Sequence, residues 1–225
     1  MTQLLSPSHE ILRDIAKAGS IEPDKPVFLD GVSWDLFEEF MEELDRNKRH
    51  LRITYDEGRL EIMPLTNRHE QNKKLLARLV EMYGFELELE VTGAGSVTLK
   101  KLKRKALEPD ECYYVQTPAP GIDVMALDLK KYPPPDLAIE IDITRSSIPR
   151  QPVYAFIAVP EVWRFNGERV IVLHRNPDGK YDEAPMSLAF PKLSGTDINR
   201  FLAMSNQMSQ SAVIRAFRDW LREQH

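Results

Sequence analysis

The stretch PDLAIEIDIT, residues 135–144, contains a predicted buried strand, Leu137 to Ile143, that carries two acids. It follows a proline-rich connection, and Glu140 and Asp142 interrupt its apolar residues at alternating positions. Because successive side chains point to opposite faces of a strand, both carboxylates lie on one face and the neighbouring isoleucines on the other. An unpartnered carboxylate inside a sheet is costly, so these acids need partners.

The segments around this strand predict a mixed α/β fold. A short helix around residues 153–158 follows it, and strands at 161–165 and 169–175 are joined by the NGE turn at 166–168. This order of strand, helix, strand and hairpin is typical of a sheet covered by helices.

The first half of the chain predicts a second hairpin between two amphipathic helices. Ser33 can cap a helix with apolar residues at three-to-four spacing, and residues 51–63 form two alternating runs around a turn at Gly58. The stretch at 65–84 is the strongest helical pattern and is expected to end at Gly84. We expect two strands to follow, FELELEV (85–91) and SVTLKK (96–101).

Composition bounds the class of protein. With 225 residues, 42% hydrophobic, the chain is expected to form one domain at 31–205, with an N-terminal arm at 1–30 and a packed C-terminal helix at 206–225. A single cysteine excludes an intramolecular disulfide, and neither a signal peptide nor a membrane span is expected, which predicts a cytoplasmic protein. The net charge of −5 means that any nucleic-acid contact must come from a local basic surface.

A second acidic stretch, ALEPDECYYVQ at residues 106–116, places Asp110 at the start of a predicted strand. Asp110 is either a turn residue or an oxygen ligand that the sheet holds rigidly. Taken together with Glu140, it suits a hard divalent cation such as Mg²⁺, which binds carboxylate and water oxygens. The basic run KKLKRK at 100–105, which leads into this stretch, is either a solvated loop or a phosphate-facing rim.

Several motifs, in this order and spacing, resemble one nuclease family. They are YDEGRLEIM (55–63), RHE (68–70), GAGSVTLK (93–100), LEPDECYYV (107–115), PDLAIEIDIT (135–144) and VYAFIAVPEVWRF (153–165). The chain resembles the "putative restriction endonuclease" family of Uma-two type, within the PD-(D/E)XK nuclease superfamily. The resemblance implies a restriction-endonuclease-like α/β core with an added hairpin, Mg²⁺ or Mn²⁺ as cofactor, and DNA as substrate.

The resemblance also implies roles for individual residues. Asp110 and Glu140 would bind the metal, with the backbone carbonyl of Ile141 as a further ligand. Glu70 matches an acidic position that points toward the metal from the first core helix, and His69 precedes it. Read from the residues alone, Glu70 could instead form a capping box with the asparagine three positions earlier. His69 could equally be structural or exposed.

The chain departs from the superfamily pattern at the third motif position, where Asp142 replaces a lysine. The family's basic group would then be Arg150, one turn before Tyr154, which is expected to pack near the site. Arginine can stabilise a phosphate but cannot act as a base near neutral pH. Asp142 could be a further ligand, hold Arg150, or form a structural ion pair with Arg145 or Arg150.

The resulting prediction is an endonuclease that cleaves DNA as a homodimer. The alternatives are a catalytically impaired nuclease fold that binds DNA or protein, and a structural protein whose acids form ion pairs. The prediction requires the carboxylates of Asp110 and Glu140 to meet at one point. Arginines that clamp both carboxylates and leave no room would count against it.

Overall fold

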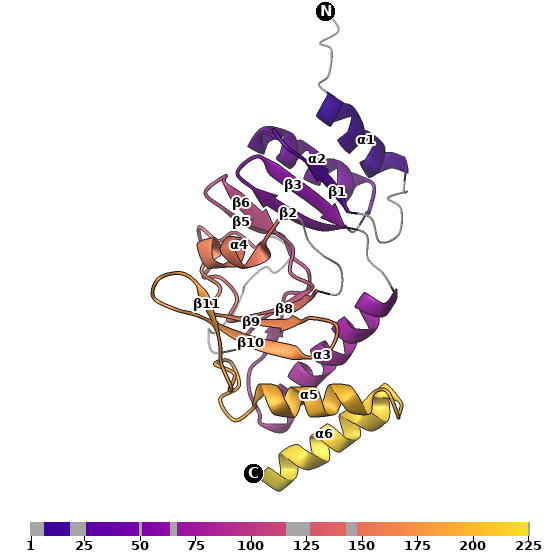
Figure 1. Ribbon diagram of the computed structural model, residues 1–225, viewed down its shortest axis with the longest axis vertical. Coiled ribbons are helices and arrows are strands. Elements are labelled where there is room, and N and C mark those ends of the chain that lie inside the picture. The colour runs from indigo at the N-terminus through magenta and orange to yellow at the C-terminus, as the bar shows by residue number, and fades with distance from the viewer. Residues whose placement is uncertain are drawn as a thin grey trace, which may run out of the picture.

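Two sheets make up the centre of the molecule. The computed structural model describes residues 7–18, 26–49, 51–63, 67–115, 127–142 and 148–224. Figure 1 shows one sheet above the other, with helix α4 (Arg150–Ile157) between them. The predicted mixed α/β architecture is confirmed.

The larger sheet is mixed and has six strands in the order β11-β10-β9-β8-β7-β4. Strands β8 and β9 are parallel, with α4 as their crossover, and the other pairs are antiparallel. The predicted order of strand, helix, strand and hairpin is therefore correct. The strands are β4 (Thr92–Gly93), β7 (Glu111–Tyr114), β8 (Leu137–Ile141), β9 (Glu161–Phe165), β10 (Val170–Arg175) and β11 (Tyr181–Glu183).

The smaller sheet is antiparallel throughout, in the order β1-β3-β2-β6-β5. The predicted hairpin is present, and Gly58 in its turn has φ +94°, a conformation that glycine adopts without steric cost. The strands are β1 (Val27–Leu29), β2 (Arg52–Asp56), β3 (Arg59–Met63), β5 (Leu99–Lys101) and β6 (Lys105–Leu107).

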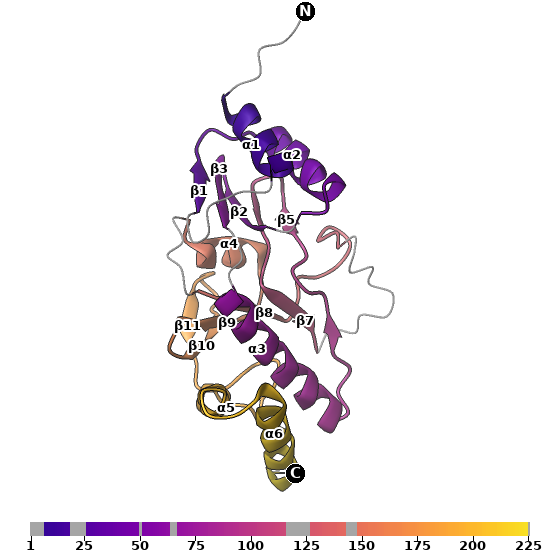
Figure 2. The ribbon, with the colours of Figure 1, turned by 90° about the vertical axis from the view of Figure 1, so that its right-hand side faces the viewer.

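Helices cover the outer face of each sheet. α1 (Pro7–Ala18) and α2 (Trp34–Arg46) enclose a core with the smaller sheet, and Ser33 caps α2 by accepting a hydrogen bond from the Leu36 amide. α3 (Asn67–Glu86) and α5 (Gly195–Met204) pack on the larger sheet, and α6 (Gln210–Gln224) packs against these two helices. Figure 2 shows α3 lying over β7 and β8. The domain boundaries at 30 and 205 stay a prediction.

A third core lies between the sheets and determines which side chains meet there. Ala138 and Val162 of the larger sheet pack with Val153 of α4 and with Leu107 of the smaller sheet. Ile139 and Ile141 face the opposite way, into the core with α3. Glu140 therefore points toward α4 and the smaller sheet, as alternation along the strand predicts.

Two predicted boundaries are wrong. Residues 85–91 do not form a strand, because α3 continues past Gly84 to Glu86 and the chain then turns, so that only Thr92–Gly93 pairs with β7. Gly84 lies inside the helix, where a Cβ atom would come within 2.6 Å of a Val91 methyl. Strand β8 ends at Ile141, so Asp142 lies beyond the strand, and residue 143 lies outside the described residues.

No helix of the described ranges is both long enough and apolar enough to cross a membrane.

Candidate functional site

The two acidic strands bring Asp110 and Glu140 together. Glu111 of β7 pairs with Ile139 of β8, which places Asp110 beside the end of β8. The Asp110 amide donates to the Ile139 carbonyl at 3.1 Å, and the Ile141 amide donates to Asp110 Oδ2 at 2.6 Å. Asp110 is therefore fastened on both sides to the strand that carries Glu140, and both side chains are buried.

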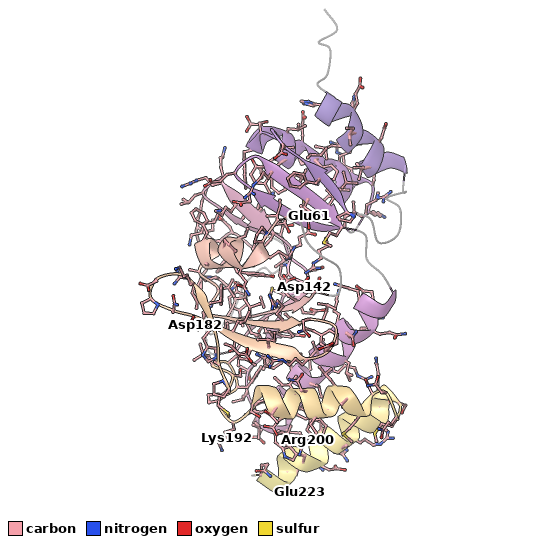
Figure 3. All side chains as sticks on the ribbon, in the orientation of Figure 1. Glu61, Asp142, Asp182, Lys192, Arg200 and Glu223 are labelled. Atoms are coloured by element: carbon pink, nitrogen blue, oxygen red, sulfur yellow. The ribbon has the colours of Figure 1, made fainter. Side chains whose placement is uncertain are left out.

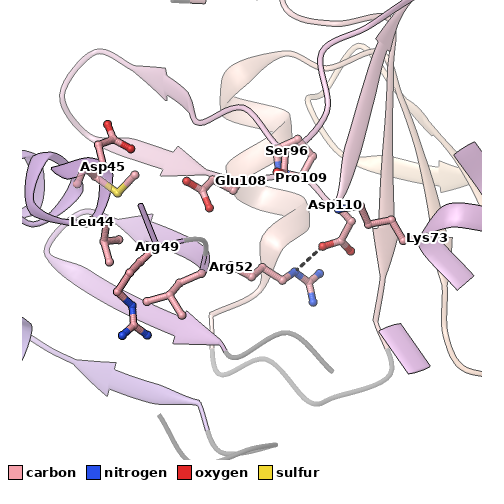
Figure 4. Close-up of a pocket in the computed structure, with 11 residues that line it drawn as sticks. Leu44, Asp45, Arg49, Arg52, Lys73, Ser96, Glu108, Pro109 and Asp110 are labelled. Atoms are coloured by element: carbon pink, nitrogen blue, oxygen red, sulfur yellow. Dashed lines mark ion pairs between the residues drawn. The ribbon is translucent and has the colours of Figure 1, made fainter. Parts of the chain in front are cut away.

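A third buried residue, Arg52 of β2, joins these acids from the other sheet. Its Nη2 pairs with Glu140 Oε2, and its Nη1 donates to the Ile141 carbonyl at 3.3 Å. Its Nε lies 3.3 Å from Asp110 Oδ1, a contact that is ionic and lacks hydrogen-bond geometry. Figure 4 shows Arg52 and Asp110 pointing toward one another. One guanidinium thus contacts three of the four groups that the family resemblance implies as metal ligands, all except Glu70.

Arg150, at the start of α4, holds Glu140 from the opposite side. Its Nε and Nη2 donate to Glu140 Oε1 at 3.0 and 2.7 Å, and the Tyr154 hydroxyl donates to the same oxygen. Arg150 also donates through Nη1 to Thr54 Oγ1 at 2.6 Å and through Nη2 to the Glu108 carbonyl. Burial alone would lower the pKa of Arg150, but Glu140 raises it above its ordinary value, so this guanidinium stays charged.

The first turns of α3 bring His69 to the site, while Glu70 lies at its edge. His69 Nε2 lies 3.1 Å from Asp110 Oδ1, and Nδ1 lies 3.4 Å from Glu70 Oε1. Glu70 also lies 3.7 Å from Lys73, and within the described part of the chain no contact joins it to Asp110 or Glu140. The side chain of the expected capping partner, Asn67, lies outside the described residues.

Asp142 follows the end of β8 and is tied to β9 through its backbone. Its amide donates to the Phe165 carbonyl at 2.7 Å, and Figure 3 labels its half-buried side chain near the middle of the molecule. Burial raises the pKa of Asp142, and the charges of Arg52 and Arg164 oppose that rise. Among the described residues no ion pair joins Asp142 to Arg150, and Arg145 lies outside them.

The electrostatic balance keeps Asp110 ionised. Burial alone would raise the pKa of Asp110, but the charge of Arg52 and the neighbouring His69 lower it to about 2. Burial alone would lower the pKa of Arg52, and the charges of Asp110 and Glu140 raise it. The buried centre therefore contains two carboxylates and two guanidiniums, whose formal charges cancel.

A cavity of about 70 Å³ opens beside Arg52 and Asp110. It contains Glu108, whose carboxylate accepts a hydrogen bond from Thr98 Oγ1 at 2.8 Å. Burial raises the pKa of Glu108 to about 7. Figure 4 shows Lys73 on the Asp110 side of the cavity and Asp45 on the Glu108 side. The lining residues are Met41, Leu44, Asp45, Arg49, Leu51, Arg52, Lys73, Ser96, Glu108, Pro109 and Asp110.

The oxygens around Arg52 are of the kinds that bind a hard cation. Two carboxylates and one backbone carbonyl converge on a single positive group, and Mg²⁺ prefers such ligands. The guanidinium stands in for the cation in this conformation. Across the described residues, no cluster of three or more His, Cys, Asp or Glu side chains is arranged to bind a metal ion. A metal could therefore use these oxygens only if Arg52 moved away.

Five residues predicted from the sequence lie together at this site: Asp110, Glu140, Ile141, Arg150 and Tyr154. Their roles stay predictions. Sequence reasoning missed the residues that β2 contributes, because the alternation of LRITY looks like an ordinary strand with one exposed face. Both faces of β2 are in fact buried. A buried arginine needs a carboxylate partner, but the sequence does not show that the partner lies on another sheet.

A comparison with models of protein families identifies the family of this chain. A family model described as "Uma2: Putative restriction endonuclease" matches residues 37–204, a range that contains every residue of the site. A comparison with curated proteins finds no match.

Proposed function

Because the chain belongs to the Uma2 family, a restriction-endonuclease-like branch of the PD-(D/E)XK nucleases, we propose that it is a Mg²⁺-dependent endonuclease that cleaves DNA phosphodiester bonds. Membership of this family supports nuclease activity, and nucleases of this type generally depend on a divalent metal ion. The metal, the DNA substrate and the residue roles below are our proposal.

The observation that carries this proposal is the convergence of three oxygens on one positive group, the Arg52 guanidinium. Asp110, Glu140 and the Ile141 carbonyl would hold Mg²⁺ or Mn²⁺, with Glu70 as an outer ligand. A divalent cation there would supply Lewis-acid chemistry, polarising the scissile phosphate and lowering the pKa of the attacking water.

The chain's own residues would orient these ligands. Arg150 and Tyr154 fix Glu140, while the Ile141 amide and His69 fix Asp110. We expect Arg150 to act as a positioning residue, because its Nε, Nη1 and Nη2 all have protein acceptors. Ligands held in this way have little freedom to lose when a cation binds.

DNA is the proposed partner, in the cytoplasm, and a homodimer is the proposed assembly. Cleavage of both strands of a duplex usually calls for two sites, which two copies of the chain would supply. Light scattering of the free and DNA-bound protein measures how many copies assemble. The dimer proposal is wrong if a single copy binds the DNA and cuts both strands.

A plasmid nicking assay with and without Mg²⁺ or Mn²⁺ tests the activity. We expect metal-dependent nicking by the parent protein and its loss in Asp110→Asn. Asp182→Asn is the matched control, because Asp182 lies on β11, three strands from β8, and hydrogen-bonds to Asn176. Figure 3 labels Asp182 and Asp142 at separate places. Equal cleavage by the parent and Asp110→Asn would refute the assignment.

The ion pairs of both acids favour one second candidate, a nuclease fold that has lost turnover and binds nucleic acid or protein. Arg52 and Arg150 clamp Glu140, and Asp142 stands where the superfamily has lysine. Replacing Arg150 by lysine separates the two proposals. If Arg150→Lys cleaves DNA and the parent does not, the chain is a nuclease that has lost its activity. If the parent cleaves DNA and Arg150→Lys does not, the activity requires arginine at this position.

A further inference from the structure

Arg52 differs from Arg150 in what it touches. Arg150 spreads its donors over Glu140, Thr54 and the Glu108 carbonyl, so it is part of the framework. In the described part of the chain, the contacts of Arg52 go to the carboxylates of Asp110 and Glu140 and to the Ile141 carbonyl. These are the groups proposed above to hold a divalent cation.

We propose that Arg52 is an internal competitor for this cation site, an autoinhibitory side chain that leaves when a divalent metal binds. The inference rests on the proposed function and adds a regulatory residue that neither the sequence pattern nor the family match assigns. The supporting geometry is the contact of one guanidinium with three oxygens. The guanidinium comes from β2 of the smaller sheet, whereas the oxygens lie at the larger sheet.

The guanidinium and a metal ion exclude one another for two reasons. They need the same oxygens, since Arg52 already uses one oxygen of each carboxylate and the carbonyl of Ile141. They also repel, because two like charges a few ångströms apart interact strongly inside a protein, where the effective dielectric constant is far below that of water. With Arg52 in place the site is already neutral, and a divalent ion would add an uncompensated charge.

The structure also offers Arg52 somewhere to go. The cavity of about 70 Å³ adjoins its side chain, and Asp45 and Glu108 lie on the wall away from Asp110. Figure 4 shows these acids on the opposite side of the cavity from Lys73. A water molecule takes up roughly 30 Å³ of liquid volume, so the cavity is larger than one water needs. We expect the released guanidinium to pair with a carboxylate of this cavity.

The functional consequence is a metal affinity set by Arg52. A ligand that binds only a minor conformation has an apparent affinity reduced by the population of that conformation. The parent protein should therefore bind metal weakly until Arg52 is displaced. Phosphate groups of bound DNA would favour displacement, because they attract the guanidinium.

Direct measurement of Mn²⁺ binding tests the competition without any activity assay. Free Mn²⁺, followed by electron paramagnetic resonance, is titrated into the parent protein, Arg52→Met and Arg49→Met. Methionine keeps most of the apolar stem and removes the charge. Arg49 lines the same cavity and forms no ion pair with Asp110 or Glu140 within the described residues, so its variant controls for loss of a nearby positive charge. We expect at least tenfold tighter binding in Arg52→Met and less than a twofold change in Arg49→Met.

Two outcomes separate this inference from the proposed function. Equal Mn²⁺ affinity in the parent and Arg52→Met, with binding lost in Asp110→Asn, would overturn the competition and leave the metal site standing. Absence of binding in both the parent and Arg52→Met would overturn the metal-dependent function, and the inference with it.

A measurement on the parent protein covers the case in which Arg52→Met does not fold. Arginine Nε–H resonances, assigned with the conservative variant Arg52→Lys, are followed by NMR during Mg²⁺ titration. We expect the Arg52 signal to shift and sharpen as the side chain is released. An Arg52 signal that stays unchanged while Mg²⁺ saturates the site would refute the proposal.

Discussion

Replacing Arg150 by methionine removes the guanidinium that joins Glu140 to Thr54 and to the Glu108 carbonyl. The buried Arg150 donates to Glu140 at 3.0 and 2.7 Å and to Thr54 Oγ1 at 2.6 Å. Methionine fills much of the space of the aliphatic stem, so the main change is the loss of charge and hydrogen bonds. The carboxylate of Glu140 would remain buried with Arg52 and Tyr154 as partners.

The expected cost follows from this geometry. Breaking a buried ion pair by removing one partner costs about 3–5 kcal/mol, because the other charge stays desolvated. Arg52 and Tyr154 still compensate Glu140 in part, which places the estimate for Arg150→Met at the lower end, about 3 kcal/mol.

Urea denaturation at neutral pH, extrapolated to water, measures the free energy of unfolding of the variant. Arg169→Met is the control, since its pair with Glu183 has a similar Nη1–Oε1 distance of 2.8 Å but is exposed on both sides. We expect no measurable loss there, because exposed ion pairs are screened by solvent. The reasoning is refuted if Arg150→Met is as stable as Arg169→Met.

Three further predictions concern stability. Burial, opposed by the hydrogen bond from Thr98, raises the pKa of Glu108 to about 7 from an ordinary value of 4.5, so the parent loses stability as pH rises from 4.5 through 7. Glu108→Gln cannot ionise and should be more stable than the parent by about 3 kcal/mol above pH 7, as urea melts across pH 4–8 would show; parallel pH profiles would contradict this. Burial raises the pKa of Asp110, but Arg52, His69 and Arg150 together lower it to about 2 from 3.8, so the stabilisation by the ionised carboxylate is present above pH 4 and lost as pH falls through 2. When the free energy of unfolding is measured as pH is lowered, the parent should lose about 2 kcal/mol that Asp110→Asn does not lose. An equally flat dependence on pH in the parent would contradict this prediction. Gly84→Ala should destabilise by about 1–3 kcal/mol in thermal melts, because its Cβ would meet the Val91 methyl at 2.6 Å, and a gain in stability would show that α3 can shift to make room.

Local patterns predicted the elements that hold the two acids. Alternation in LAIEI and the aromatic run after Asp110 each specify a strand, and antiparallel pairing then brings Asp110 beside Glu140. The hairpin around Gly58 and the helix that Ser33 caps were equally predictable, since a turn residue and a cap act within a few positions of the chain.

Contacts between the two sheets could not be predicted in the same way. Arg52 and Glu140 are 88 positions apart and belong to separate sheets. The periodicity of β2 shows which side chains share a face, but not that this face is covered by α4 and the larger sheet. The sequence of this strand therefore does not show that Arg52 is buried against the site.

The expected strand at 85–91 failed for a tertiary reason. Its alternating glutamates and leucines match a strand pattern, but of its apolar residues Phe85 and Leu89 are exposed, and Leu87 and Val91 are only partly buried. Close packing of Gly84 on Val91 instead lets α3 run on to Glu86 before the chain turns. Propensity decides little where no partner strand is available.

The most direct test of the cation site is a crystal soaked in Mn²⁺ and measured at a wavelength where manganese scatters anomalously. We predict one anomalous peak bound by Asp110, Glu140 and the Ile141 carbonyl, with the Arg52 guanidinium moved into the neighbouring cavity. A fully soaked crystal with no peak there, and with Arg52 still on both carboxylates, would contradict the account.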